Sequence, residues 1–203
     1  MLPRLTTSQR NQLTGAPGMM IYNTDENKFQ GFANEFGLTK VAESEISAAD
    51  YSIIRDGVNE TRVAQTFTPT LAGELKSLEI KISSFDPGFP LTIALYLGNT
   101  PGTGTLINSQ NVAVSQAGWI TMNFQPGYIL QPSKTYYFIV SANSVSSNQA
   151  SVYTSNSNPA GQHPGGTLYY YNAGNGVYDQ APLDDLDFHI NSLVNTPGWK
   201  NLY

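Results

Sequence analysis

The sequence predicts an all-β protein: an antiparallel β-sandwich of the jelly-roll type, with a small N-terminal helix-turn and β-hairpin appendage. Three observations carry this prediction. Apolar and polar residues alternate with a period of two in several short segments, as in strands buried on one face. Turn-forming clusters such as Asp86–Gly88 and Asn99–Gly102 separate these segments. Helical periodicity is almost absent after residue 60.

The appendage comes first and is expected to span residues 1–36. Thr6–Leu13 begins with a capping residue and ends before a cluster of glycine and proline, so it predicts one helical turn. Met19–Asn23 and Lys28–Phe32 flank the turn sequence Thr24–Asn27, which predicts a hairpin. Residues 37–62 are expected to form a linker.

The sandwich is expected over residues 63–191, followed by a C-terminal tail over 192–203. Its strands are predicted at the alternating segments Val63–Thr68, Leu78–Ile82, Leu91–Leu97, Ile120–Phe124, Thr167–Tyr171 and Leu186–Ile190. Thr135–Ala142 is apolar on both faces and predicts a central strand.

The composition excludes several classes of partner. Charged residues make up 12% of the 203 residues, and the formal net charge is −5. Lysine and arginine are scattered, so no basic stripe is available for nucleic acid and no polybasic cluster for a membrane surface. The longest apolar runs are shorter than the roughly 18 residues of a membrane span. Cysteine is absent, which excludes disulfides, thiolate metal sites and a cysteine nucleophile.

Catalytic groups are scarce, and we predict that the protein is not an enzyme and has no catalytic residue. Its imidazoles are His163, in a turn sequence, and His189. His189 alternates with the apolar Phe188 and Ile190, which predicts a surface or edge position. No serine nucleophile elbow or phosphate-binding glycine loop is present.

A group of aspartates near the last predicted strand is a candidate structural calcium site. Calcium takes six to eight oxygen ligands, and the candidates are Asp184, Asp185 and Asp187. Their spacing is not that of an EF-hand loop, and the alternative is a solvated acidic turn. No other cofactor is expected.

A second candidate site combines aromatic and polar residues near the end of the sandwich: Tyr169, Tyr171, Asn172, Tyr178 and Asp179. Aromatic rings pack on the C–H faces of sugars while amides and carboxylates bind the hydroxyls, which indicates a glycan site. The alternative is that the tyrosines stabilise a sheet as cross-strand pairs, because consecutive tyrosines point to both faces.

The N-terminal segment resembles a known module. Residues 2–11 read Leu-Pro-Arg-Leu-Thr-Thr-Ser-Gln-Arg-Asn, and residues 18–28 read Gly-Met-Met-Ile-Tyr-Asn-Thr-Asp-Glu-Asn-Lys. This pattern resembles a short module of fibre-like and surface proteins of Bacteroidetes and their phages, written PRLTTAQR…GMMIYNTDTNK. The resemblance implies an attachment or oligomerisation element beside a larger domain. The module usually ends in YNG-W, which residues 32–36 replace here, so the trailing hairpin is expected to differ.

The remainder, residues 63–191, resembles the galactose-binding-like β-sandwich repeats of extracellular proteins. The resemblance rests on the segments Ala64–Thr68, Leu75–Ile80, Gly118–Phe124, Leu130–Phe138 and Leu186–Ile190. Such sandwiches serve as sugar-binding modules, adhesin stalks and spacers, so the resemblance implies a fold without naming a ligand.

Together these features lead to an expected function. The fibre-type module, the lack of a signal-peptide-like apolar core in residues 1–20 and the weakly charged surface favour a structural, virion-associated bacteriophage protein. It would be a fibre, head-fibre or decoration subunit that displays its sandwich outward, located in the virion or outside the cell, with other virion proteins as partners. The alternative is a carbohydrate-binding module or adhesin domain that binds a cell-surface glycan.

Residues 1–36 are also expected to make assembly contacts, through Leu2, Leu5, Met19, Met20, Ile21, Tyr22 and Phe29. A segment this short buries too little apolar surface by itself. We therefore expect a homo-oligomer, with a trimer favoured. The alternative is an arm that packs on its own sandwich.

Overall fold

The structure, a computed structural model, describes residues 1–45, 50–55, 61–86, 90–142, 149–154, 165–181 and 184–202. Its regular elements are almost all strands, which confirms the all-β prediction. The chain divides into two compact units: a small unit of Met1–Leu38 with Leu193–Tyr203, and a larger unit of Thr39–Ser192. No helix in the described part of the chain is long and apolar enough to span a membrane.

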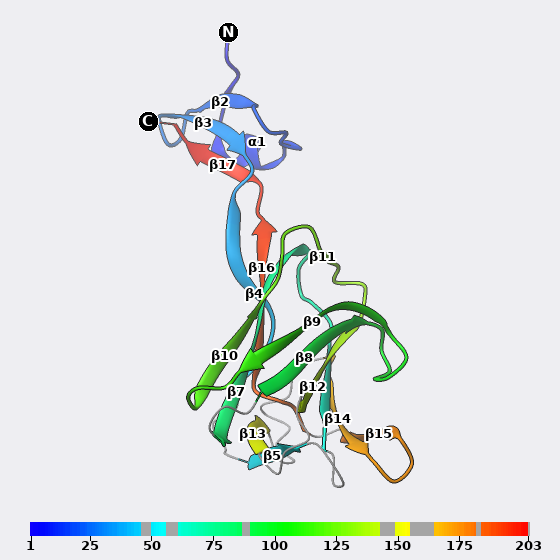
Figure 1. Cartoon of the computed structure of the whole chain (residues 1–203). Coiled ribbons are helices and arrows are strands. Elements are labelled where there is room, and N and C mark those ends of the chain that lie inside the picture. Colours follow the sequence, from blue (N-terminus) through cyan, green and yellow to red (C-terminus); the bar gives the residue numbers. More distant parts are fainter. Residues whose placement is uncertain are drawn as a thin grey trace. The chain divides into compact units, whose positions relative to one another are not determined.

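The small unit is a four-stranded sheet with the order β1-β2-β3-β17 (Figure 1). Its strands are β1 (Arg4–Leu5), β2 (Met20–Asn23), β3 (Lys28–Ala33) and β17 (Gly198–Asn201). β2 and β3 form the predicted antiparallel hairpin, and β1 runs parallel to β2. The predicted helical turn is α1 (Thr7–Asn11), which begins with a capping box between Thr6 and Gln9.

The last strand corrects the expected domain boundaries. β17 pairs with β3, so the segment expected to be a C-terminal tail completes the sheet of the N-terminal module. Gly198–Asn201 is short and shows no apolar alternation, which is why its sequence does not indicate a strand. The larger unit is therefore an insertion between Leu38 and Leu193 of the small unit.

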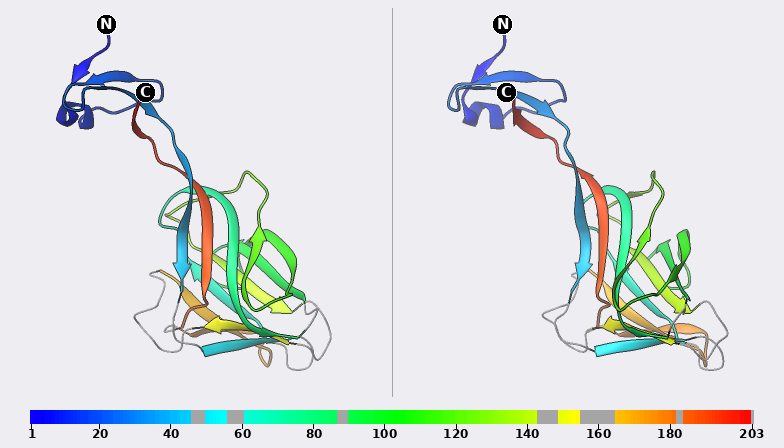
Figure 2. Two further views of the ribbon diagram at one scale, coloured as in Figure 1. Left: turned by 90° about the vertical axis from the view of Figure 1, so that its left-hand side faces the viewer. Right: turned by 60° about the vertical axis from the view of Figure 1, so that its left-hand side comes forward.

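The larger unit is a β-sandwich of two sheets (Figure 2). The first sheet has the order β4-β16-β7-β13-β5, and β10 and β11 also pair with β7. Its strands are β4 (Phe36–Ser44), β5 (Asp50–Arg55), β7 (Gly73–Phe85), β10 (Gly118–Asn123), β11 (Ile129–Leu130), β13 (Gln149–Thr154) and β16 (Phe188–Asn195).

The second sheet has the order β15-β14-β6-β12-β8-β9. Its strands are β6 (Val63–Phe67), β8 (Pro90–Leu97), β9 (Thr105–Ala113), β12 (Tyr136–Ala142), β14 (Thr167–Asn172) and β15 (Val177–Ala181). β12 lies between β6 and β8, so the prediction of a central strand there is confirmed.

The core of the larger unit lies between these two sheets. Phe138 on β12 packs edge-on against Phe188 on β16 of the other sheet, with ring centroids 5.4 Å apart. Phe67 on β6 contacts both rings, and all three side chains are fully buried. The alternating Leu78, Ile80 and Ile82 of β7 are also fully buried, as their period of two predicts.

The expected linker over residues 37–62 is not a linker. It contains most of β4 and all of β5, which belong to the first sheet. The alternation that marks other strands fails in β4, because the adjacent residues Val41 and Ala42 are both buried. This irregularity hides the strand from a search for period-two patterns.

Candidate functional site

The register of the small sheet gives it two chemically different faces. Ile21 pairs with Gln30, and Phe32 pairs with Trp199, so these side chains lie on the same side of the sheet. We call this side the covered face, because α1 and the segment after it pack there. The opposite side, which we call the open face, carries Arg4, Met20, Tyr22 and Phe29.

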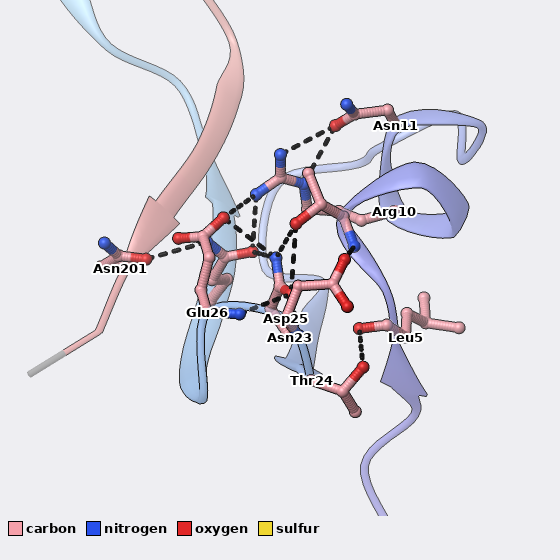
Figure 3. A network of polar contacts seen from close by, with 10 residues as sticks. Leu5, Arg10, Asn11, Asn23, Thr24, Asp25, Glu26 and Asn201 are labelled. Atoms are coloured by element: carbon pink, nitrogen blue, oxygen red, sulfur yellow. Dashed lines mark hydrogen bonds and ion pairs between the residues drawn. The ribbon is translucent and has the colours of Figure 1, made fainter.

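A polar network centred on Asn23 fills part of the covered face (Figure 3). Asn23 is fully buried, and its amide nitrogen lies 3.1 Å from Thr7 Oγ1, from Glu26 Oε1 and from Gln30 Oε1. Its Oδ1 accepts hydrogen bonds from the backbone N–H groups of Asp25 at 3.0 Å and Glu26 at 3.3 Å. One side chain thus fixes the hairpin turn and joins it to α1.

Arg10 on α1 and Asn201 on β17 extend this network (Figure 3). The Arg10 guanidinium donates to Glu26 Oε1 at 3.1 Å and to Gln30 Oε1 at 2.9 Å. Gln30 Nε2 donates to Glu26 Oε2 at 3.1 Å and to Asn201 Oδ1 at 2.8 Å. The helix, the hairpin and the C-terminal strand are therefore joined by side-chain hydrogen bonds.

The network explains the chemistry of the N-terminal motif. Thr7, Arg10, Asn23 and Asp25 match the module that the segment resembles, and Glu26 stands where that module has threonine; each has a hydrogen-bond partner within the small unit. Hydrogen bonds to charged groups are the stronger class, worth about 1.5–3 kcal/mol each. The polar letters of the motif thus hold the unit's own fold.

The rest of the covered face is apolar and closely packed. Ile21 is only 1% exposed. The Phe32 ring packs edge-on against Trp199, with centroids 5.3 Å apart. On its other side the ring lies so close to Gly15 that a Cβ there would be 2.1 Å from it. Only glycine fits at residue 15 with this packing.

The open face presents apolar side chains that no described segment of the small unit covers. Met20 is 43% exposed and Phe29 is 49% exposed. The Phe29 ring packs edge-on against Tyr22 at 5.0 Å, and the Arg4 guanidinium lies 5.0 Å from the centre of the Tyr22 ring. With Leu2, three of these side chains line a pocket of about 360 Å³.

Exposed apolar side chains are concentrated in this unit. Those of the small unit are Met1, Leu2, Leu13, Met19, Met20, Phe29, Phe36, Leu38 and Leu202. The larger unit, which is about three times as long, exposes among its described residues only Leu71, Leu106, Ile129 and Val177. Of these residues, Met20 and Phe29 lie on the open face and Leu2 lines its pocket, so this face is the candidate functional site.

The predicted assembly residues fall largely on the accessible surface of the small unit. Those that are exposed or half-buried are Leu2, Leu5, Met19, Met20, Tyr22 and Phe29. Ile21 is the exception, because alternation along β2 points it to the covered face. Its prediction as a direct contact to another copy is wrong.

The five residues predicted to bind a glycan do not form one site. They lie on the β14–β15 hairpin, where Tyr171 pairs with Tyr178 and Tyr170 pairs with Asp179. The period of two therefore places Tyr169, Tyr171 and Tyr178 on one face of the sheet. Asn172 and Asp179 lie on the opposite face, so the polar groups do not flank the rings.

These hairpin residues instead contact one another and their sheet. The Tyr171 and Tyr178 rings are 5.2 Å apart, and the Arg62 guanidinium lies 4.8 Å from the centre of the Tyr171 ring. Burial raises the pKa of Tyr178 to about 12, while the nearby Arg62 opposes that shift. The Asn172 amide donates to Asp179 at 2.9 Å. The contacts match the alternative reading of cross-strand pairs.

The predicted calcium ligands are likewise engaged elsewhere. Asp185 is buried and accepts a hydrogen bond from Gln65 Nε2 at 2.5 Å. Asp187 is buried 3.5 Å from the Lys81 ammonium. Across the described residues, no three acidic or histidine side chains are grouped so that they could hold a metal ion. Asp184, Asp185 and Asp187 therefore do not form the predicted site there.

His189 differs most from its prediction. It lies on the outward side of β16, as the alternation indicates, but it is only 6% exposed. The ring of Trp119 from β10 stacks on it at 4.0 Å. The sequence holds only a weak indication of this site. Glu79 and Lys81 are charged residues at alternate positions of β7, and Lys81 pairs with Trp119 of β10. His163 lies outside the described residues.

Comparisons with known proteins add little to this description. No family of known proteins matches the chain, and no curated protein matches it either. A solved structure described as "Structure of infectious bursal disease virus Gt strain" is similar over 84% of this chain, with 12% identity and a TM-score of 0.28. The match spans 46% of that chain, less than half its length. A likeness this distant is recorded here and supports no functional argument.

Proposed function

We propose that this protein is a structural subunit of a bacteriophage virion, in which the small unit is the base and the larger unit is the displayed sandwich. The observation that carries the proposal is the construction of the small unit. A polar network and a small apolar cluster hold its fold on the covered face, while Met20 and Phe29 are exposed on the open face. A unit built this way is completed by association.

The path of the chain supports the same role. The larger unit is inserted between Leu38 and Leu193, so both of its ends are tied to the base. A display subunit needs a base that folds on its own residues and a separate module with its own core. Polar, weakly charged surface suits a module that faces the medium rather than a nucleic acid.

We further propose that the open face binds other copies of this chain, with a trimer as the closed assembly. Met20, Tyr22 and Phe29 lie side by side on two paired strands, so one patch is offered by every copy. Identical copies that associate by rotation close into rings, which limits assembly to a defined number.

Light scattering of the purified chain tests the assembly. We expect a mass near three times the 22.1 kDa of one chain. Phe29→Glu places a charge on the open face and should give monomers that are still folded. Leu106→Glu is the matched control, since Leu106 is 53% exposed on the larger unit. A monomeric wild-type chain at high concentration would overturn the association.

Peptide mass spectrometry of purified phage particles tests the virion role separately. The protein should be present at a constant ratio to the other particle proteins. If it is absent from particles but oligomeric in solution, the virion role is wrong and the assembly proposal stands. We propose no carbohydrate-binding function, because the residues that motivated it lie on two faces of the sheet.

A further inference from the structure

A buried histidine surrounded by charged side chains lies on the outward side of the first sheet, apart from the core and the open face. At its centre is His189 on β16, which is 6% exposed. The Trp119 ring lies nearly parallel to the imidazole, with centroids 4.0 Å apart and 21° between the planes. Histidine is the side chain that changes charge in the physiological pH range.

Charged groups face the imidazole from two neighbouring strands. Glu79 on β7 places Oε2 at 3.0 Å from Nδ1. From β4, Lys40 places Nζ at 3.0 Å from Nε2. Glu45, just after β4, lies 3.5 Å from Nε2, and Glu43 lies 3.9 Å from it. β10 contributes the uncharged Trp119.

The nearest charge along the chain belongs to Asp187, which directly precedes β16. It lies on the same side of the sheet as His189, two residues away, and 3.5 Å from the Lys81 ammonium. Lys81 also lies 5.6 Å from the centre of the Trp119 ring. This second pair borders the cluster and does not contact the imidazole nitrogens.

The geometry fixes the neutral tautomer. A lysine ammonium is a donor only, so Nε2 must accept from Lys40 and carry no hydrogen. The hydrogen then lies on Nδ1 and is donated to Glu79. Lys40 also pairs with Glu43 at 2.9 Å, so it bridges the imidazole and a carboxylate of its own strand.

Protonation is incompatible with this arrangement. Both nitrogens of an imidazolium are donors, so Nε2 can no longer accept from Lys40, and the two cations repel each other. Glu45 and Glu43 are the acceptors near Nε2. We propose that His189 is a proton-controlled clasp between β4 and β16, in which acid replaces Lys40 by a carboxylate as the partner of Nε2.

The clasp joins the two strands that connect the units, and this role is separate from the proposed display function. β4 and β16 are the strands through which the chain passes from the small unit to the larger unit and back. When the imidazole is neutral, Lys40 on β4 joins the two strands by donating to its Nε2. In acid, the imidazolium donates to a carboxylate, so that both partners of the bond are charged.

Trp119 supplies a direct readout, because a protonated imidazole in contact with an indole quenches its fluorescence. The chain has two tryptophans, so Trp199→Phe leaves Trp119 as the reporter. As the solution is acidified we expect a sigmoidal loss of emission. His189→Gln should abolish it, and the matched control His163→Gln should leave it unchanged. A flat titration of the folded Trp199→Phe variant overturns the proposal.

Two further variants test the exchange of partners. Lys40→Met removes the competing ammonium, so the midpoint should move to higher pH. Glu45→Gln removes an acceptor of the protonated ring, so the midpoint should move to lower pH. Nitrogen NMR of the imidazole should show Nε2 without hydrogen at neutral pH. A protonated Nε2 there, or a midpoint indifferent to Lys40→Met, contradicts the clasp.

Discussion

The two units of this protein differ in the contacts that hold their folds. The larger unit buries apolar rings such as Phe138 between two sheets, and it also buries polar residues such as Gln65 and Asp185. The small unit buries Asn23 and Gln30, at 0% and 2% exposure, and places Met20 and Phe29 outside. A unit this small encloses little apolar surface. Its fold therefore combines these hydrogen bonds with the packing of Phe32 on Trp199, and Met20 and Phe29 remain for other contacts.

The largest loss of stability should come from disrupting the apolar core of the larger unit. Phe138→Ala removes a fully buried ring that contacts Phe67 and Phe188. The larger unit should lose about 3–5 kcal/mol of unfolding free energy. Urea unfolding followed by circular dichroism measures it. Ile129→Ala is the control, because Ile129 is 52% exposed and should change little.

Asn23→Ala disrupts the polar network of the small unit. This change removes the amide that contacts Thr7, Glu26 and Gln30, and should destabilise the small unit by about 1.5–3 kcal/mol. Hydrogen exchange should then speed up in β2, β3 and β17 but not in β12. Asn123→Ala is the matched control on an exposed position. Equal protection in both variants would mean that the network does not hold the unit.

A smaller effect should follow from Gly15→Ala. The new methyl group would lie 2.1 Å from the Phe32 ring, which must shift against Trp199. Overpacking of this kind destabilises by about 1–3 kcal/mol. Gly37→Ala is a sharp control, because nothing lies within 4 Å of a Cβ there. Thermal unfolding of the two variants should differ, and identical curves would show that the Phe32 packing is absent.

The smallest effect should be on the stability of the larger unit at alkaline pH. Burial raises the pKa of Tyr178 from 10.0 to about 12. The unfolded chain therefore releases this proton first, so the stability conferred by the neutral side chain is present below pH 10.0 and lost as pH rises toward 12. Tyr178→Phe should weaken the alkaline loss of stability, measured by urea unfolding across that range. An unchanged pH profile contradicts the burial of Tyr178.

The sequence predicts features that depend on neighbouring residues and misses those that depend on pairing between distant segments. Alternation is a local signal, and it correctly predicts strands such as Leu78–Ile82 in β7. It cannot predict β17, whose partner β3 lies at the other end of the chain. It also places His189 on the correct side of its strand while missing Trp119, which comes from another strand and covers it.

The candidate site was predicted better as a segment than as a surface. The apolar content of residues 1–36 correctly marks where exposed apolar residues gather. The face of each residue depends on strand pairing, which places Ile21, predicted as an assembly contact, on the covered face. The hairpin tyrosines show the same limit, because their pairing separates them from Asn172 and Asp179.

The insertion has a consequence for the order of events during synthesis. β17 is translated after every residue of the sandwich, and it supplies both Trp199 for Phe32 and Asn201 for Gln30. While the ribosome is still making residues 39–192, the base therefore lacks an edge strand and two of its contacts. The last strand of the sandwich is β16, which lies between β4 and β7 and is translated just before β17. A complete base then exists only on a chain whose sandwich has already been made, which delays association until the displayed part is ready.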